Sequence, residues 1–317
     1  MMTVQLSTPD NQRVFPISTV PQMPSVTLNA AVVPLPALGA QKTFRWTVQL
    51  RFAGSETSHG KPGTQLNVSR TTTDGRLVIN PGDWGGLRGG TLSVSLTATV
   101  NGQTAAGQLL GLTIVGTNPT AADVRTALGS DPLRRIAHQE SNYRQFGGDS
   151  WPLFSSDNLG GAGIMQITPA PEDQRWNWRT NVQAGIDKYN HCYNLTATYV
   201  QSVRTSGQFS ALVTALNQTR AQQHLPALTV TIPDWTADMR MRDAIRGYNG
   251  WAGSDPVVPN LHLHEYRLAR DANGRLLVNQ PPNTNRAEAI WESVPASARP
   301  QGVGDPNYVA HVLAQTP

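Results

Sequence analysis

The sequence has little cysteine, little charge and no long apolar run, and each shortage excludes a class of protein. Its 317 residues include one cysteine, Cys192, which cannot form an internal disulfide or a cysteine-based metal site. No stretch approaches the ~18 apolar residues of a membrane-spanning helix. The first residues lack a basic segment followed by an apolar one, so we expect no signal peptide. The sequence therefore predicts a protein that is made in the cytoplasm without a recognisable leader and without membrane insertion.

Charge is sparse and nearly balanced along the chain. Charged residues make up 15% of it, and 25 Lys and Arg oppose 21 Asp and Glu, which gives a formal net charge of +4. The chain has no block of Lys or Arg and no basic–aromatic pattern of an RNA-binding domain, so we expect no nucleic-acid partner. A hydrophobic content of 38% and a length suited to two or three domains predict a folded, globular protein.

The first part of the chain has the pattern of short strands. Residues 43–52 and 92–100 alternate apolar with polar side chains, as in a strand with one wet face. Asn101-Gly102 predicts a tight hairpin turn after residue 100, and Asp74-Gly75 separates two further short strands. Strands punctuated by turns at this spacing are typical of a β-sandwich. We predict an all-β, immunoglobulin-like sandwich over residues 1–118, without the cysteine pair of antibody domains.

Near residue 118 the pattern changes to helical spacing. Thr120 with Asp123 three residues later predicts a helix start, and Asp131-Pro132 predicts the start of a helix that runs to Ser141. Apolar spacing predicts further helices at residues 180–203, 209–216, 236–248 and 305–313. The sequence therefore predicts a second domain, residues 119–317, that is mainly α-helical.

Glu140 is expected on the buried face of the helix that begins at Asp131. Leu133, Ile136 and Ala137 form one apolar stripe, and Glu140 lies one turn beyond Ile136. Burial disfavours the charged form of a carboxyl group, so we expect a raised pKa for Glu140, as a general acid near neutral pH requires. The alternative is a buried structural acid that is held by a backbone group or an arginine.

Five short motifs follow one another in the second part of the chain. They are Glu140-Ser141, Gly160-Gly161-Ala162-Gly163-Ile164-Met165-Gln166-Ile167, Asn181-Val182-x-x-Gly185-Ile186-x-x-Tyr189, Gly247-Tyr248-Asn249-Gly250 and Tyr308-Val309-x-x-Val312-Leu313. Their order resembles that of the soluble lytic transglycosylases and their relatives with the goose-type lysozyme fold. The resemblance covers roughly residues 120–317 and none of the first 118. It implies a lysozyme-like fold for the second domain.

The resemblance also implies roles for individual residues. Glu140 takes the position of the family's sole catalytic acid/base, and Tyr248 with Asn249 takes the position of a Tyr-Asn pair near that glutamate. The other residues that it places in the substrate-binding cleft are Ser141, Gly163, Met165, Gln166 and Ile167. Core packing is an equally good interpretation of Met165, Ile167 and Tyr248.

The sequence departs from the family pattern at a few positions. Ile164 stands where leucine is usual, and Gly247 stands where alanine is usual. The stretch between Asn249 and Asp305 is longer and richer in proline than in compact members. These departures leave the assignment of Glu140 unchanged.

The implied activity is cleavage of the β-1,4 bond between N-acetylmuramic acid and N-acetylglucosamine in peptidoglycan. In a lytic transglycosylase this reaction consumes no water and leaves a 1,6-anhydro ring, so one carboxylate suffices. A hydrolytic muramidase (lysozyme) is the alternative, with Asp157 as the second carboxylate that activates water. A non-catalytic wall-binding or structural protein is a third alternative. Because every chemical motif follows Thr120, we expect residues 1–118 to be dispensable for cleavage.

No cofactor is expected. His262 and His264 with Glu265 lack a third spaced cluster and the HExxH order, so we predict no metal site. Six of the eight tryptophans lie in residues 119–317; Trp151 and Trp178 are nearest the motifs and could pack on sugar faces, although we expect most to fill the core.

The expected partner is the glycan strand of peptidoglycan. We predict that the β domain is a docking or targeting module, for example on a phage particle or a secretion apparatus. Without a leader, the protein would reach the cell wall or periplasm after lysis, by injection or as part of a particle. A phage lysin and an antibacterial effector both fit this route.

Overall fold

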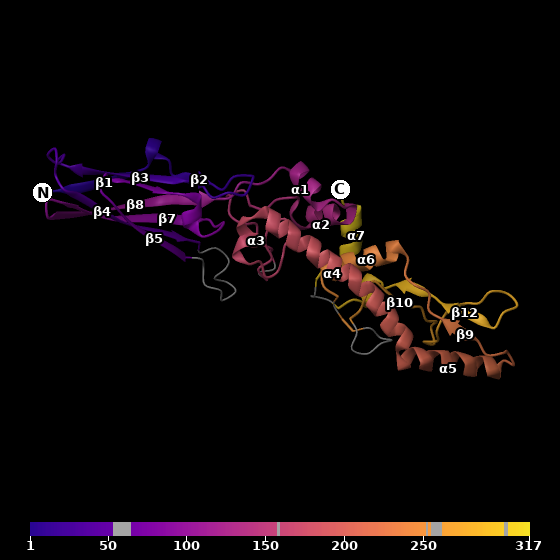
Figure 1. Ribbon diagram of the computed structural model, residues 1–317. Helices are drawn as coiled ribbons and strands as arrows, with labels where there is room; N and C mark the ends of the chain where they lie inside the picture. The colour runs from indigo at the N-terminus through magenta and orange to yellow at the C-terminus, as the bar shows by residue number, and fades with distance from the viewer. Residues whose placement is uncertain (53–64, 157–158, 252, 255–261, 301–303) are drawn as a thin grey trace. The chain divides into compact units, whose positions relative to one another are not determined.

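The computed structural model describes residues 1–52, 65–156, 159–251, 253–254, 262–300 and 304–317 (Figure 1). An N-terminal β-rich region is followed by a mainly helical C-terminal region, as the sequence pattern predicts. The described residues form two compact units. The first comprises Met1–Gly129 and Glu140–Gly185, and the second comprises Ser130–Gln139 and Ile186–Pro317. Each unit therefore contains segments that are discontinuous in the sequence.

The β-rich region contains two sheets. A five-stranded sheet has the order β2-β8-β7-β4-β5, and a three-stranded sheet has the order β1-β3-β6. Neighbouring strands are antiparallel except β2 and β8, which are parallel. The strands are β1 (Thr3–Ser7), β2 (Val14–Pro16), β3 (Val26–Val33), β4 (Lys42–Arg51), β5 (Gln65–Thr72), β6 (Arg76–Ile79), β7 (Gly90–Val100) and β8 (Gln103–Val115). Short 3₁₀ helices lie at Pro9–Asn11 and Pro81–Trp84.

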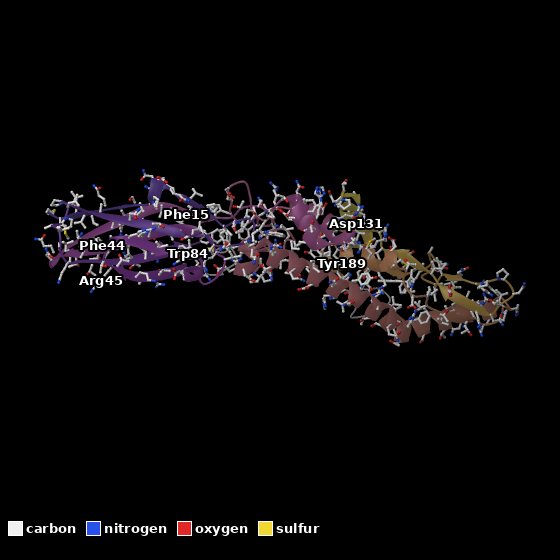
Figure 2. All side chains as sticks on the ribbon, turned by 45° about the horizontal axis from the view of Figure 1, so that its top comes forward. Phe15, Phe44, Arg45, Trp84, Asp131 and Tyr189 are labelled. Carbon is white, nitrogen blue, oxygen red and sulfur yellow. The ribbon has the colours of Figure 1, made fainter. Side chains whose placement is uncertain are left out.

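Both sheets contribute to one apolar core. The alternation in β4 buries Phe44 and Trp46 while Arg45 between them stays exposed, as predicted for a strand with one wet face. Figure 2 places Phe44 and Trp84, both buried, among these strands. The predicted hairpin is confirmed, because Val100 pairs with Gln103 and both residues of the turn have positive φ, 46° and 83°. Asp74-Gly75 instead connects β5 and β6, which belong to different sheets.

An aromatic cluster extends this core into residues 140–185 of the first unit. The cluster consists of Phe52, Phe146, Trp151, Phe154 and Trp176. The ring centroids of Phe52 and Trp176 lie 5.2 Å apart in an edge-to-face arrangement, and those of Phe146 and Trp176 lie 6.0 Å apart. Phe146 and Trp176 share one buried core with the strands.

Two glycines of the β-rich region make this packing possible. A Cβ atom on Gly89 would lie 2.3 Å from the Trp176 ring, and a Cβ atom on Gly116 would lie 2.2 Å from the Phe146 ring. The indole nitrogen of Trp178 also donates to Thr19 O over 2.8 Å. The expectation that residues 1–118 are dispensable therefore conflicts with this packing, since their removal would expose part of the core of residues 140–185.

Most of the predicted helices are present with similar bounds, but the helix at Glu172–Trp176 was not predicted, and the helix predicted to end at residue 216 extends to Gln222. The helices are α1 (Ala121–Leu128), α2 (Asp131–Ser141), α3 (Glu172–Trp176), α4 (Trp178–Thr205), α5 (Gly207–Gln222), α6 (Ala237–Tyr248) and α7 (Tyr308–Ala314). The hydroxyl of Thr120 accepts from Asp123 N over 3.1 Å, so the predicted cap of α1 is confirmed. Thr236 caps α6 in the same way by accepting from Met239 N. In the described part of the chain, none of the helices is both long and apolar enough to span a membrane.

Short strands in the C-terminal region were not predicted. They are β9 (Thr229–Thr231), β10 (Tyr266–Leu268), β11 (Val278–Asn279), β12 (Arg286–Ala289) and β13 (Trp291–Ser293), and a 3₁₀ helix follows at Ala296–Ala298. They form a sheet of order β11-β12-β9 and a pair β10-β13. Tyr199 and Val203 of α4 and Phe209 of α5 share a buried core with Leu268 and Ala289 of these strands. The strands thus complete the core of the second unit.

Candidate active site

Glu140 lies in the last turn of α2. The predicted apolar stripe is confirmed, because Leu133, Ile136 and Ala137 are all buried. Glu140 itself is half-buried, and Ser141 beside it is buried. The residue that carries the candidate acid is therefore partly removed from water at the end of the helix.

Ser141 connects the end of α2 to the glycine-rich segment, residues 160–167. Its hydroxyl donates to Ile164 O over 2.8 Å, and both groups are buried. A buried hydroxyl and a buried carbonyl are each costly to leave without a partner, so this hydrogen bond fixes the segment next to Glu140 in the first unit. The contact joins two of the five motifs that the sequence singled out.

Two buried amide side chains hold the backbone of the glycine-rich segment. Gln145 Oε1 accepts from Ile164 N over 3.2 Å, and Asn181 Oδ1 accepts from Met165 N over 2.8 Å. Asn181 Nδ2 donates to Ala162 O over 2.8 Å. Gln145 and Asn181 have no exposed surface. The sequence pattern indicates no role for Gln145, and it includes Asn181 only as part of a motif.

Gly163 lies between these two amides. A Cβ atom at this position would be 2.5 Å from the Gln145 amide and 2.7 Å from Asn181 Nδ2. Its φ of +77° is also in the left-handed region that favours glycine. Both observations require glycine at this position, so its place in the motif has a structural reason.

Gln145 also ties the glycine-rich segment to more distant parts of the first unit. Its Nε2 donates to Gln174 O over 2.9 Å and to Arg175 O over 2.8 Å at the end of α3. Its backbone nitrogen donates to Asn118 Oδ1 over 2.8 Å. Arg175 is half-buried, and burial lowers the pKa of its guanidinium. The segment beside Glu140 is thus held by a connected set of buried hydrogen bonds.

Of the residues predicted to contact substrate, Met165 packs in the core and Gln166 hydrogen-bonds within the segment. Met165 is buried against α4, where a Cβ atom on Gly185 would lie 2.5 Å from Met165 Cγ. Gln166 Nε2 donates to Gly163 O over 2.8 Å and to Leu153 O over 3.2 Å. Ile167 is half-buried. Substrate contact by Met165, Gln166 and Ile167 stays a prediction.

Tyr248 and Asn249 lie at the end of α6 in the second unit. Tyr248 is buried, and Lys188 Nζ lies 4.3 Å from the centre of its ring. Asn249 Nδ2 donates to Asp305 O over 3.3 Å. Because Glu140 belongs to the first unit, the predicted contact between Tyr248 and Glu140 stays a prediction.

Buried charges connect α6 to the residues that follow it. Arg246 Nη1 donates to Asp305 O over 2.6 Å, and Arg299 pairs with Glu265. Burial, together with the charge of Arg299, lowers the pKa of the Arg246 guanidinium. Burial raises the pKa of the Glu265 carboxyl group, although the positive charge of Arg299 opposes the shift. The helix that ends in Tyr248 is therefore fixed by desolvated polar groups.

No family model and no curated protein matches this chain. Asp157, the predicted second carboxylate, lies outside the described residues, so its role stays a prediction. Among the residues that the structure describes, no group of three or more His, Cys, Asp or Glu side chains could hold a metal ion.

The two tryptophans nearest the motifs take part in packing. Trp151 is half-buried in the aromatic cluster, with its ring centroid 6.0 Å from that of Trp176. Trp178 is buried and uses its indole nitrogen on Thr19 O. Both side chains therefore serve the core of the first unit, as we expected for most tryptophans.

Proposed function

We propose that the protein cleaves peptidoglycan at the β-1,4 bond between N-acetylmuramic acid and N-acetylglucosamine, as a lytic transglycosylase. The main support is the convergence of Glu140-Ser141, the glycine-rich segment and Asn181 in the first unit. Ser141, Gln145 and Asn181 all bind the backbone of residues 162–165. A glycine-containing backbone that is held by hydrogen bonds and adjoins a half-buried glutamate suits a cleft where a sugar approaches a general acid.

The reaction uses one carboxyl group twice. Protonated Glu140 donates its proton to the glycosidic oxygen, and the bond from that oxygen to C1 of the muramoyl residue breaks through an oxocarbenium-like state. The resulting carboxylate takes the proton of the muramoyl C6 hydroxyl, and O6 forms a bond to C1. The products are a 1,6-anhydromuramoyl end and a free C4 hydroxyl on N-acetylglucosamine, and Glu140 is protonated again.

We further propose that the β-rich region is an immunoglobulin-like sandwich that docks the enzyme, and that residues 119–317 have a lysozyme-like fold. Two sheets that share one apolar core support the first part. The order of the helices that carry Glu140, Asn181 and Tyr248 supports the second. A phage particle or a secretion apparatus is the proposed partner of the β-rich region.

The test is the digestion of purified sacculi by the full chain, followed by mass spectrometry of the released fragments. We expect 1,6-anhydromuramoyl products, which are lighter than hydrolysis products by one water. Products with reducing ends would contradict the transglycosylase mechanism and favour the hydrolase. If Asp157→Asn then abolished those products, Asp157 would be the residue that activates water.

Substitution of Glu140 tests its role as the acid. Glu140→Gln should reduce the rate of sacculus clearing by about 10²–10⁴-fold, the usual contribution of general acid–base catalysis. Asp131→Asn is the matched control, since it removes a carboxylate from the first turn of the same helix and should leave the rate within a few fold. Equal rates for Glu140→Gln and the control would exclude Glu140 as the acid.

A further inference from the structure

Asp243 of α6 is a fully buried carboxylate with three hydrogen-bonding partners in the second unit. Its Oδ1 accepts from Glu265 N over 2.7 Å and from Trp251 Nε1 over 3.4 Å. His264 Nδ1 lies 2.8 Å from Asp243 Oδ2. A buried carboxylate is costly unless donors surround it. Here those donors come from the chain after α6, so Asp243 anchors that chain to the helix.

The indole of Trp251 is held by a second ring. His264 stacks on Tyr199 with ring centroids 3.9 Å apart, and the ring of Trp251 lies 4.7 Å from that of His264. Asp243 therefore fixes the edge of the indole through its N–H, and His264 supports its ring. The orientation of Trp251 is set by side chains of its own unit before any ligand binds.

Gly247 makes room for this indole. A Cβ atom on Gly247 would lie 2.4 Å from Trp251 Cζ2 and 2.6 Å from Cε2. The departure from alanine that the sequence shows at this position is thus explained by Trp251. Gly247 lies one helical turn after Asp243, and Trp251 follows the end of α6, so the small residue and the indole fit each other.

Trp251 keeps part of its surface exposed in spite of these contacts. Trp176, Trp178 and Trp235 are buried, whereas Trp251 and Trp291 are half-buried. Trp291 donates its N–H to Pro233 O and packs against Tyr199 and Trp235. Trp251 differs from Trp291 because a buried carboxylate orients it and because it directly follows Tyr248-Asn249-Gly250.

We propose that Trp251 is an aromatic binding residue for an N-acetylated hexosamine ring of the glycan, and that Asp243 is its positioning residue. An indole presents a flat apolar surface that complements the apolar face of a pyranose ring. Its fixed orientation reduces the entropy lost when the sugar binds. The inference rests on the proposed function for the identity of the ligand, and it adds a binding residue that the family motifs do not include.

The binding test uses the full chain with Glu140→Gln, so that cleavage does not interfere. The probe is penta-N-acetylchitopentaose, a β-1,4-linked oligomer of N-acetylglucosamine, in isothermal titration calorimetry. Trp251→Ala should raise Kd by about tenfold, and Trp251→Phe, which retains a ring, by less. Trp291→Phe is the matched control and should leave Kd unchanged. Unchanged Kd in both folded Trp251 variants, or no binding by the parent chain, would overturn the inference.

A second measurement needs no substitution at Trp251. N-bromosuccinimide oxidises accessible indoles, and mass spectrometry of the digested protein locates the oxidised residue. We expect oxidation of Trp251 in the free protein and protection by saturating penta-N-acetylchitopentaose, with no change at Trp291. Equal oxidation of Trp251 with and without a bound oligomer would contradict sugar contact.

These measurements separate the inference from the proposed function. Release of anhydromuropeptides with a glycan affinity independent of Trp251 would overturn the inference alone. Trp251-dependent binding without cleavage by the unsubstituted chain would overturn the proposed function alone. Asp243→Asn, which keeps an oxygen acceptor for Trp251, should raise Kd severalfold, and Asp243→Ala should raise it further. A lower melting temperature with unchanged Kd in both variants would assign Asp243 to stability only.

Discussion

Gly163 illustrates how a single residue can set the geometry next to Glu140. The amides of Gln145 and Asn181 lie where its side chain would be, and both use their oxygens to hold the segment on either side. Any side chain at this position would displace at least one of the amides. The resulting loss of stability would come both from backbone strain at positive φ and from broken buried hydrogen bonds.

We therefore predict that Gly163→Ala lowers the free energy of unfolding by about 2–4 kcal/mol, because a left-handed φ and a displaced buried amide each cost about 1–3 kcal/mol. Sacculus clearing should fall as well. Denaturant unfolding measures the first effect. Gly148→Ala is the control, since a Cβ atom at that position meets nothing within 4 Å. Its free energy of unfolding should differ from that of the parent chain by no more than about 0.5 kcal/mol. Similar stabilities of the two variants would contradict the role assigned to the buried amides.

At the scale of the element, α4 has a pH-dependent contribution to stability. Burial raises the pKa of the Tyr189 phenol to about 12 and that of the Cys192 thiol to about 11, against ordinary values of 10.0 and 9.0. Both residues are buried in the second unit, and Figure 2 places Tyr189 on this helix. The fold thus favours the neutral forms. The two buried groups therefore contribute to the free energy of unfolding in their neutral forms. This contribution is fully present below pH about 9 and is lost as the pH rises through 11 to 12.

The melting temperature should therefore fall between pH 9 and pH 11, as measured by circular dichroism. Cys192→Ala removes one of the two groups, so its melting temperature should depend less on pH over this interval, even if the cavity lowers it at every pH. The comparison uses the change of melting temperature with pH, so it does not depend on the absolute melting temperature of either protein. If the melting temperature changed equally with pH in the variant and the parent chain, the Cys192 thiol would not contribute to the pH dependence of stability.

The elements also show which features a sequence can predict. Asn101-Gly102 and Thr120 act on backbone groups within three residues, so the hairpin turn and the cap of α1 could be predicted from the sequence. Strands β9 to β13 have two to four residues each, too few for a period of two to be recognised. Gln145 acts on Ile164, 19 residues away, and on Arg175, 30 residues away. No local pattern indicates such a contact, so its role could not be predicted.

At the scale of the whole molecule, the aromatic cluster couples the β-rich region to residues 140–185. Phe52 directly follows β4, and its ring contacts Trp151, Phe154 and Trp176. The segment that carries Ser141 and Gln145 thus shares its stability with the strands. Sequence patterning did not indicate this coupling, because an aromatic residue at the end of a strand has the same pattern whichever neighbour it meets.

We predict that Phe52→Ala lowers the free energy of unfolding by about 3–5 kcal/mol and also reduces sacculus clearing. Phe44→Ala is the matched control. Phe44 is equally buried in the same core, but it lies eight residues earlier in the chain, roughly 26 Å along an extended strand. It should lower stability by a similar amount without changing the rate at temperatures where the protein is folded. A normal rate in folded Phe52→Ala would limit the aromatic cluster to a role in stability.

Each of the two units is built from two separate segments of the chain, which limits where recombination can replace one domain with that of another protein. The chain passes from one unit to the other after residues 129, 139 and 185. A single recombination point near residue 118 would join residues 140–185 to a foreign set of strands. Such a chimera would retain Phe146 and Trp176 but not the matching glycines at positions 89 and 116. Exchange of the β-rich region should therefore succeed only when the donor strands have small residues at these two positions.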